Sequence, residues 1–227
     1  MQLKVEGGAI PSNCEGEIMK LGDIKIEALK IMFVNYNTDL TIDELDNAMQ
    51  DENYGSYLVN MPGAINRCFS VLEERRVLPI KSYTLSPSQG LASGSFIRFN
   101  LEELIDDYFD IDRLVCEKEK SYDGNVDFRM EGNVLVLPLI GDEVYTVMYY
   151  PALERVNSES DNETELKIPN KIAAHIPYFI KGDLYRDDEP DEANESRNWF
   201  EAAIQSIVNT KQAHSGRIEN KYSQTEI

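Results

Sequence analysis

The spacing of the apolar residues changes twice along the chain, and this alternation constrains the fold more than any other feature of the sequence. In residues 21–72 apolar side chains recur at the three- and four-residue intervals of helices, and the same spacing returns in residues 172–207. Residues 95–150 instead hold short runs of strand-forming residues separated by glycine-containing turns. This order predicts an α+β protein, a mainly α-helical bundle with an inserted antiparallel β meander, and both ends of the insertion should leave the same end of the bundle.

The first helical region predicts three helices. One begins near Leu21, and its apolar face consists of Ile24, Ala28, Ile31 and Met32. Thr41 and Glu44 have the spacing of a capping box, which predicts a second helix of about two turns. The third has one apolar stripe, made of Leu58, Met61, Ile65, Phe69 and Leu72. Pro62 lies within this stripe and should either kink its first turns or mark its true start.

The middle region predicts a series of strands. The extended or strand segments are residues 77–80, 95–100, 111–120, 126–130, 134–139 and 144–150. Residues 86–95 are rich in serine, glycine and proline and predict a loop. Short turns at residues 131–133 and 141–142 join the last three strands, so we expect these strands to pair consecutively as the meander.

The remaining segments complete the predicted organisation. Residues 156–166 are almost wholly polar and predict a linker or long loop that is disordered alone and orders on docking. Helical spacing resumes at Ile172, where Pro177 should kink or split the helix, and Pro190 fits the first position of a last helix that fades near Lys211. The predicted divisions are an irregular arm (1–18), a helical bundle (19–76 and 167–212), an inserted β module (77–155), the linker (156–166) and a flexible tail (213–227).

The charge balance excludes two kinds of partner. The chain has 41 acidic residues against 22 lysines and arginines, a net charge of -19, so it is unsuited to neutralising nucleic-acid phosphates or to adhering to an anionic lipid surface. Its three cysteines are far apart and predict neither a zinc site nor a disulfide framework. No segment predicts a membrane span or a signal peptide, so we expect the protein to stay in the cytosol or in an assembly made there.

Motifs that carry catalysis are missing from the sequence. There is no nucleophile elbow, phosphate-binding glycine loop or paired-histidine zinc motif, and the acidic run at residues 106–112 lacks the glycine and the final glutamate of a calcium loop. One of the two histidines, His175, lies beside an apolar stripe, and the other, His214, lies in the polar tail. We therefore predict no catalytic, cofactor-binding or metal-binding residues, and no enzyme.

The acidic residues gather in two clusters. One consists of Glu102, Glu103, Asp106, Asp107, Asp110 and Asp112, and the other of Asp183, Asp187, Asp188, Glu189, Asp191, Glu192 and Glu195. The plain interpretation is a solvated surface. A sharper one is a surface that repels DNA phosphates, and the opposite use, imitation of those phosphates, is also open. The candidate channel or surface acids are Asp106, Asp107, Asp110, Asp187, Asp191 and Glu192.

The last two predicted helices carry a recognisable pattern of residues. It consists of Pro177, Tyr178, Leu184, Tyr185, Asp188, Glu189, Pro190, Ala193, Arg197 and Phe200. This pattern resembles the C-terminal signature of head–tail connector (adaptor) proteins of tailed bacteriophages. The predicted meander, which ends in Tyr149-Tyr150-Pro151, and the opening Gly22-Asp23 helix are similar to the same group, so that the resemblance covers most of residues 19–210.

The resemblance implies a structural role in the virion. Such adaptors form a twelve-fold ring beneath the portal protein, bind a tail-side connector or tail protein, line part of the DNA channel and catalyse nothing. It implies that this chain is assembled in the host cytoplasm, is located at the head–tail junction, and repels passing double-stranded DNA rather than binding it or a membrane. The alternative is an acidic DNA mimic or other inhibitory binding protein.

Overall fold

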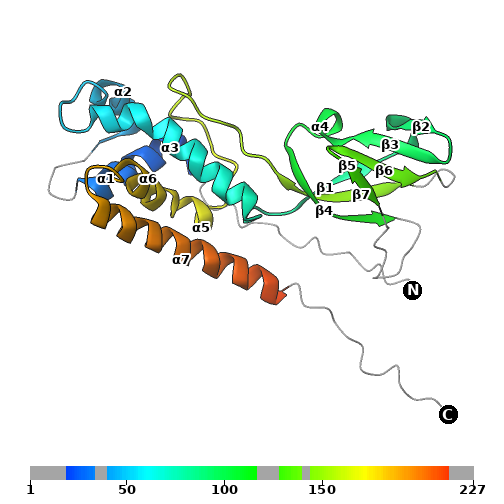
Figure 1. Ribbon diagram of the computed structural model, residues 1–227. Helices are drawn as coiled ribbons and strands as arrows, with labels where there is room; N and C mark the ends of the chain where they lie inside the picture. Colours follow the sequence, from blue (N-terminus) through cyan, green and yellow to red (C-terminus); the bar gives the residue numbers. More distant parts are fainter. Residues whose placement is uncertain (1–18, 34–39, 117–127, 140–143, 215–227) are drawn as a thin grey trace, which may run out of the picture.

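The protein is an α+β chain whose helices and strands occupy opposite ends of an elongated molecule (Figure 1). The computed structural model describes residues 19–33, 40–116, 128–139 and 144–214. The predicted arm and most of the predicted tail lie outside these residues. Two separate hydrophobic cores correspond to the two ends, one among the helices and one between the sheets.

Four longer helices build the helical part. They are α1 (Leu21–Met32), α3 (Gly55–Glu74), α6 (Ile176–Leu184) and α7 (Pro190–His214). α6 is the central element, because α1, α3 and α7 all pack against it. No helix in the described part of the chain has both the length and the apolar character needed to cross a bilayer.

The predicted helical faces are confirmed almost throughout. Every residue of the α3 stripe is at most 1% exposed, and only Ile31 on the α1 face is partly exposed. The helix continues through Pro62, seven residues after its start at Gly55, so the proline does not mark its beginning. The capping box of Thr41 and Glu44 opens the 3-10 helix η1 (Ile42–Glu44), which leads into α2 (Leu45–Ala48).

The helix predicted around Pro177 is split into two. The first piece is α5 (Asn170–Ala173), and α6 begins at Ile176 with Pro177 in its first turn. A proline there costs no intrahelical hydrogen bond, because the amides of a first turn have no partner within the helix.

The strands form two antiparallel sheets. The first has the order β1 (Lys81–Leu85), β7 (Tyr145–Pro151), β4 (Tyr108–Cys116). The second has the order β2 (Leu91–Ser93), β3 (Phe96–Asn100), β6 (Val134–Pro138), β5 (Arg129–Glu131). Two short helices, η2 (Pro87–Gln89) and α4 (Leu101–Leu104), lie between strands, and the buried residues of both sheets share one core.

The predicted meander is wrong in its last strand. β5 and β6 do form the expected hairpin, which Gly132 turns with a φ of 63° that favours glycine. β7, however, lies between β1 and β4 of the other sheet instead of beside β6. Strand order is decided by which sheet buries the alternating face of β7, and a turn signal in the sequence cannot report that. β1 and β2 were missed because both are short and mostly exposed.

The polar segment 156–166 is a long loop, one of the two forms predicted, and it is held in place against α1. The backbone amides of Leu21 and Gly22 donate to the carbonyl oxygens of Thr164 and Asn162, at 2.9 and 2.8 Å. These bonds satisfy two of the amides that the start of a helix leaves without partners. Lys25, only 2% exposed, donates from Nζ to Oδ1 of Asn162 at 2.7 Å. Polar residues in this segment therefore complete α1.

Asn162→Ala is expected to lower the free energy of unfolding by about 2 kcal/mol, because it leaves the buried Lys25 ammonium without its acceptor. Burial already lowers the pKa of Lys25, against a smaller opposite effect of Asp46. Denaturant unfolding measures the change. Ser158→Ala, in an exposed position of the same segment, is the control and should stay within about 0.5 kcal/mol of the wild type. Equal effects of the two variants would contradict the role given to Asn162.

Candidate functional site

The α6–α7 hairpin is built on an unusually close approach of its two helices. A Cβ atom on Gly182 would lie 2.6 Å from Cγ of Arg197 and 3.0 Å from the carbonyl oxygen of Ala193. Only glycine fits at this position without displacing the backbone of α7. Gly182 was not singled out in the sequence, because a glycine within a helical pattern gives no sign of what lies opposite it.

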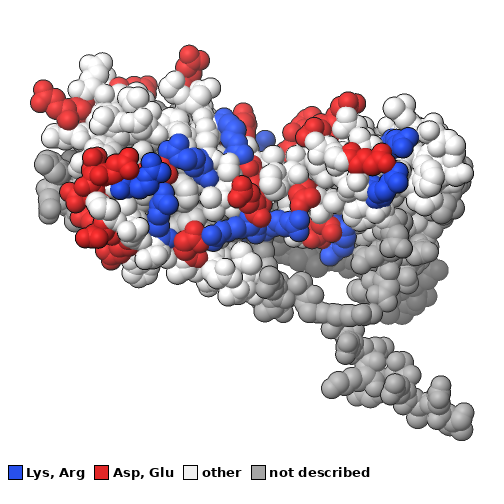
Figure 2. All heavy atoms as spheres, in the orientation of Figure 1, with Lys and Arg blue, Asp and Glu red and all other residues white. Residues whose placement is uncertain are grey.

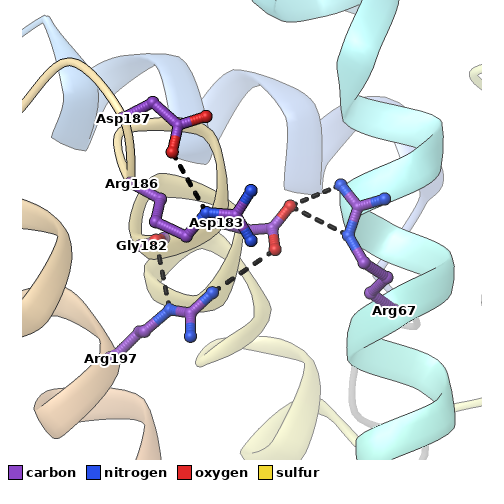
Figure 3. Close-up of polar contacts among 6 residues, drawn as sticks. All are labelled: Arg67, Gly182, Asp183, Arg186, Asp187 and Arg197. Carbon is purple, nitrogen blue, oxygen red and sulfur yellow. Dashed lines mark hydrogen bonds and ion pairs between the residues drawn. The ribbon is translucent and has the colours of Figure 1, made fainter.

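The carboxylate of Asp183 joins three helices, as Figure 3 shows. Its Oδ2 accepts a hydrogen bond from Nε of Arg67 on α3 at 3.0 Å and a second bond from Nη2 of the same guanidinium. Arg197 on α7 approaches Oδ1 to 3.5 Å and donates from Nε to the Gly182 carbonyl at 3.2 Å. The Asp183 side chain is only 8% exposed. Although it belongs to the predicted acidic cluster, its carboxylate therefore links the helices to one another and is not part of the acidic surface.

The residues of the family-like pattern divide between packing and exposure. Those that are buried are Pro177, Tyr185, Ala193 and Phe200, those that are half-buried are Tyr178, Leu184 and Arg197, and those that are exposed are Asp188, Glu189 and Pro190. Phe200 packs edge-on against Phe179, with ring centroids 5.1 Å apart. The Tyr185 hydroxyl donates to the Met32 carbonyl at 2.8 Å, and burial together with nearby negative charge raises its pKa to about 12. The pattern therefore describes how the hairpin is held on the other helices.

The outer face of α7 is the side of this hairpin that no other described element covers. Its side chains line a shallow hollow of about 470 Å³, and they are Asp191, Asn194, Glu195, Asn198, Trp199 and Ala202. We call this set the α7 face. Trp199, the only tryptophan of the chain, is 64% exposed. A large exposed aromatic side chain between acidic and amide groups is typical of the centre of a protein interface.

The acids of the hairpin are neutralised to different degrees. Asp187 accepts a hydrogen bond from its neighbour Arg186 at 3.3 Å, and Glu192 pairs with Lys181 at 2.8 Å. No lysine or arginine among the described residues lies within ion-pair distance of Asp191. Figure 2 shows acidic side chains gathered at the helical end of the visible face and mixed charges where the helical and β parts meet. Of the three candidate acids on this hairpin, Asp187, Asp191 and Glu192, Asp191 is thus the one best able to act on a partner.

Two acids of the first cluster, Asp107 and Asp110, pair with basic residues of the chain. Asp107 binds Nζ of Lys81 and accepts a 2.8 Å hydrogen bond from the Tyr149 hydroxyl. Asp110 pairs with Arg76, whose guanidinium also lies 5.5 Å from the Tyr150 ring centroid. Arg76 lies two residues after the end of α3, so its contacts fix the β part to the helical part, whereas those of Asp107 lie within the β part. The sequence showed the run of acids but not the cations that fold back onto it.

Arg76 occupies a conformation that side chains rarely adopt, with a φ of 52°. Its left-handed backbone ends α3, where the amide of Val77 donates to the Leu72 carbonyl at 3.0 Å. This backbone conformation directs the chain from α3 into the β part.

Asp106 is the candidate acid of the first cluster that remains exposed. No cation among the described residues lies within ion-pair distance of it.

The pKa of Asp107 provides a test of its contacts with β1 and β7. Burial alone would raise the pKa, but the hydrogen bonds from Lys81 and Tyr149 and the Lys81 charge outweigh it, so that the pKa lies below 3.8. Burial, and after it the bond to Asp107, raises the pKa of Tyr149. A depressed carboxyl pKa adds stability that is present above the unfolded value and lost as the pH falls through the folded one.

We therefore expect a carbon-13 titration of Asp107 to have its midpoint below 3.8. Asp107→Asn should weaken the fall in unfolding free energy between pH 5 and pH 2 by less than about 1 kcal/mol, since solvent screens this half-exposed group. Asp106→Asn, in the adjacent exposed position, is the control. A midpoint at or above 3.8 would show that the hydrogen bonds to Asp107 do not form.

A second set of contacts holds the chain where it leaves the β part. Glu73, 2% exposed, accepts from the Leu153 amide at 2.7 Å and from Nη2 of Arg155 at 2.5 Å. The side-chain amide of Asn66 exchanges two hydrogen bonds with the backbone of Val156, at 2.7 and 2.9 Å. Entry to and exit from the β part are therefore both fixed on α3.

The described residues bring no cluster of metal ligands together. A hollow of about 510 Å³ lies between segment 151–168 and the first sheet, and neither histidine nor cysteine lines it. No cluster of three or more histidine, cysteine, aspartate or glutamate side chains in the described ranges could hold a metal ion. Cys68 is buried, and burial raises its pKa well above the ordinary value, which makes it a poor nucleophile.

Comparison with known proteins adds no family to these observations. No protein-family model matches the sequence, and a search of curated proteins finds no match.

Proposed function

We propose that this chain is a structural subunit of a bacteriophage head–tail connector, which assembles with further copies, with portal protein and with a tail-side protein. The observation that carries the proposal is the α7 face: an exposed tryptophan flanked by acids on a helix whose other side is fixed by Gly182, Asp183 and Arg197. A rigid helix with an uncovered aromatic anchor is suited to binding a protein.

The charge of the chain supports the same proposal. A net charge of -19 keeps double-stranded DNA from sticking to a subunit that it must pass, because like charges repel at the distance of a channel wall. Asp106 and Asp191 are the predicted acids that contribute to such a surface, because Asp107, Asp110, Asp187 and Glu192 have basic partners in the chain.

The test is binding to portal rings. The purified chain is mixed with the cognate portal protein and examined by co-sedimentation and electron microscopy, with and without short double-stranded DNA. We expect a ring of density on one face of the portal and no retention of the DNA by the chain alone. A chain that remains monomeric and shows no affinity for portal would overturn the proposal.

The second candidate is a DNA mimic, and the spacing of the exposed acids favours it. Asp191 and Glu195 lie four residues apart on α7, which places two negative charges about 6 Å apart along the helix, and Asp187 is exposed in the turn before it. Such a protein would act as a monomer or dimer and bind a basic DNA-binding protein in a salt-sensitive complex. Competition between the chain and DNA for that partner distinguishes this function from connector assembly.

A further inference from the structure

The outer face of the second sheet differs from the rest of this acidic molecule. The strand register aligns one residue from each strand in a row across the sheet, and the row consists of Leu91, Arg98, Val136 and Arg129. Paired residues of antiparallel strands point to the same face, so these four side chains are neighbours. Phe96 and Pro138, which pair with each other, extend the face toward the ends of β3 and β6. We call these six residues the sheet face.

The sheet face points away from the β core. Leu135 and Leu137, the neighbours of Val136 along β6, belong to that core, whereas Val136 does not, although it is only 3% exposed. Val136 lies between Arg98 and Arg129 in the row, where the aliphatic stems of two arginines can cover an apolar side chain. Leu91 is 79% exposed and Phe96 49% exposed, so large apolar groups are uncovered here.

The charge of the sheet face is opposite to that of the molecule. Arg98 and Arg129 are its charged groups, and one acid of the neighbouring row, Glu131, pairs with both of them. One carboxylate cannot neutralise two guanidinium groups, so a net positive charge remains. A partner for this face must therefore offer carboxylates together with an apolar or aromatic group.

The α7 face has this chemistry. It carries the carboxylates of Asp191 and Glu195 beside the exposed indole of Trp199, and Ala202 continues its apolar part. Arginine guanidinium groups bind carboxylates with two parallel hydrogen bonds and stack on the indole ring of tryptophan. The apolar groups of the α7 face, Trp199 and Ala202, can pack against the apolar groups of the sheet face, Leu91 and Phe96.

We propose that the sheet face of one copy of this chain binds the α7 face of a second copy. The two faces lie in different parts of the molecule, as Figure 1 shows, and in the proposed contact each copy uses them to bind two different neighbours. Contacts between two unlike faces are repeated from copy to copy, and they close into a ring or continue as a filament. The inference rests on the proposed function for its ring form, but the contact itself is argued from the two faces alone.

Charge reversal tests the pairing. Arg98→Glu/Arg129→Glu gives a subunit with two acidic faces, and Asp191→Lys/Glu195→Lys gives one with two basic faces. We expect each variant alone to associate at least tenfold more weakly than the wild type in sedimentation velocity. An equimolar mixture should regain association, because each reversed face then meets a face of opposite charge.

Matched controls carry the same change in net charge outside both faces. Lys167→Glu/Lys171→Glu matches the first variant and Glu52→Lys/Glu74→Lys the second, and all four positions are exposed. The controls should associate as the wild type does. Circular dichroism verifies that each variant is folded. Loss of association in the controls, or failure of the mixture to recover it while all variants are folded, would overturn the pairing.

Disulfide trapping detects the contact even where association is too weak for sedimentation. All trapping variants carry Cys14→Ser, and Cys68 and Cys116 are buried. Leu91→Cys/Ala202→Cys, which keeps Trp199, should give a ladder of dimers, trimers and larger species on mild oxidation. The two single-cysteine variants, mixed, should stop at dimers. Absence of the ladder overturns the inference.

The outcomes separate this inference from the proposed function. A chain that binds portal rings but gives no ladder and no recovery on mixing would refute the face pairing and leave the connector role standing. A chain that forms the ladder but does not bind portal protein would support the face pairing and refute the connector role.

Discussion

Phe200→Ala is expected to lower the free energy of unfolding by about 3–5 kcal/mol, the range measured when a fully buried phenylalanine is removed. Phe200 is 1% exposed and packs edge-on against Phe179, so the variant loses the buried area, an aromatic pair and the support of α7 on α6. Urea denaturation followed by circular dichroism measures the change. A loss below about 1 kcal/mol would mean that α7 does not pack as described.

The adjacent residue provides the matched control. Trp199→Ala removes a larger side chain from the same helix, but Trp199 is 64% exposed, so the free energy of unfolding should change by no more than about 0.5 kcal/mol. Association between copies should instead weaken at least tenfold, because an exposed aromatic anchor is lost. If Trp199→Ala destabilised the fold as much as Phe200→Ala does, the α7 face would be part of the core and not a binding surface.

The sequence predicts well those features that depend on neighbours three or four residues away. The stripe of α3 and the capping box at Thr41 follow from local spacing, and both are present. The hairpin at Gly132 is equally local, since its turn needs only a residue that tolerates a positive φ. Phe200 could also be assigned to the apolar face of its helix, and it is buried there.

What the sequence does not predict are contacts between residues far apart in the chain. The acids at 107 and 110 look like a bare negative surface until Lys81 and Arg76 are seen to bind them. Lys25 lies at a position where a charged residue is normally exposed, and only Asn162, from a segment predicted to be disordered, explains why it is buried. Similarly, the place of β7 depends on β1 and β4, which no turn motif connects to it.

Local sequence also does not predict which of two neighbouring polar side chains on a helix is buried. Glu73 and Glu74 are the clearest example. Both are glutamates in the last turn of α3, yet Glu73 is 2% exposed and Glu74 is exposed. Nothing in their local sequence distinguishes them, because the distinction is made by Leu153 and Arg155, which return to α3 about 80 residues later.

Glu73→Ala is therefore expected to cost about 3 kcal/mol of unfolding free energy, whereas Glu74→Ala should stay within about 0.5 kcal/mol of the wild type. The first substitution leaves a buried amide without an acceptor and a guanidinium without its carboxylate. Hydrogen exchange at the Leu153 amide gives the local measurement, and its protection should fall about 100-fold, since 1.4 kcal/mol corresponds to a factor of ten. Unchanged protection at Leu153 would contradict the contact.

The two measurements also distinguish a local effect from a global one. If the exit segment opens while both cores persist, exchange at Leu153 rises without a matching rise at the buried amides of β6, and global unfolding shifts little. If instead Glu73 couples the cores, both rise together. We expect coupling, because Asn66 and Glu73 hold the exit from the β part on the same helix whose last turn leads into it, so that the β part cannot lose one attachment without loosening the other.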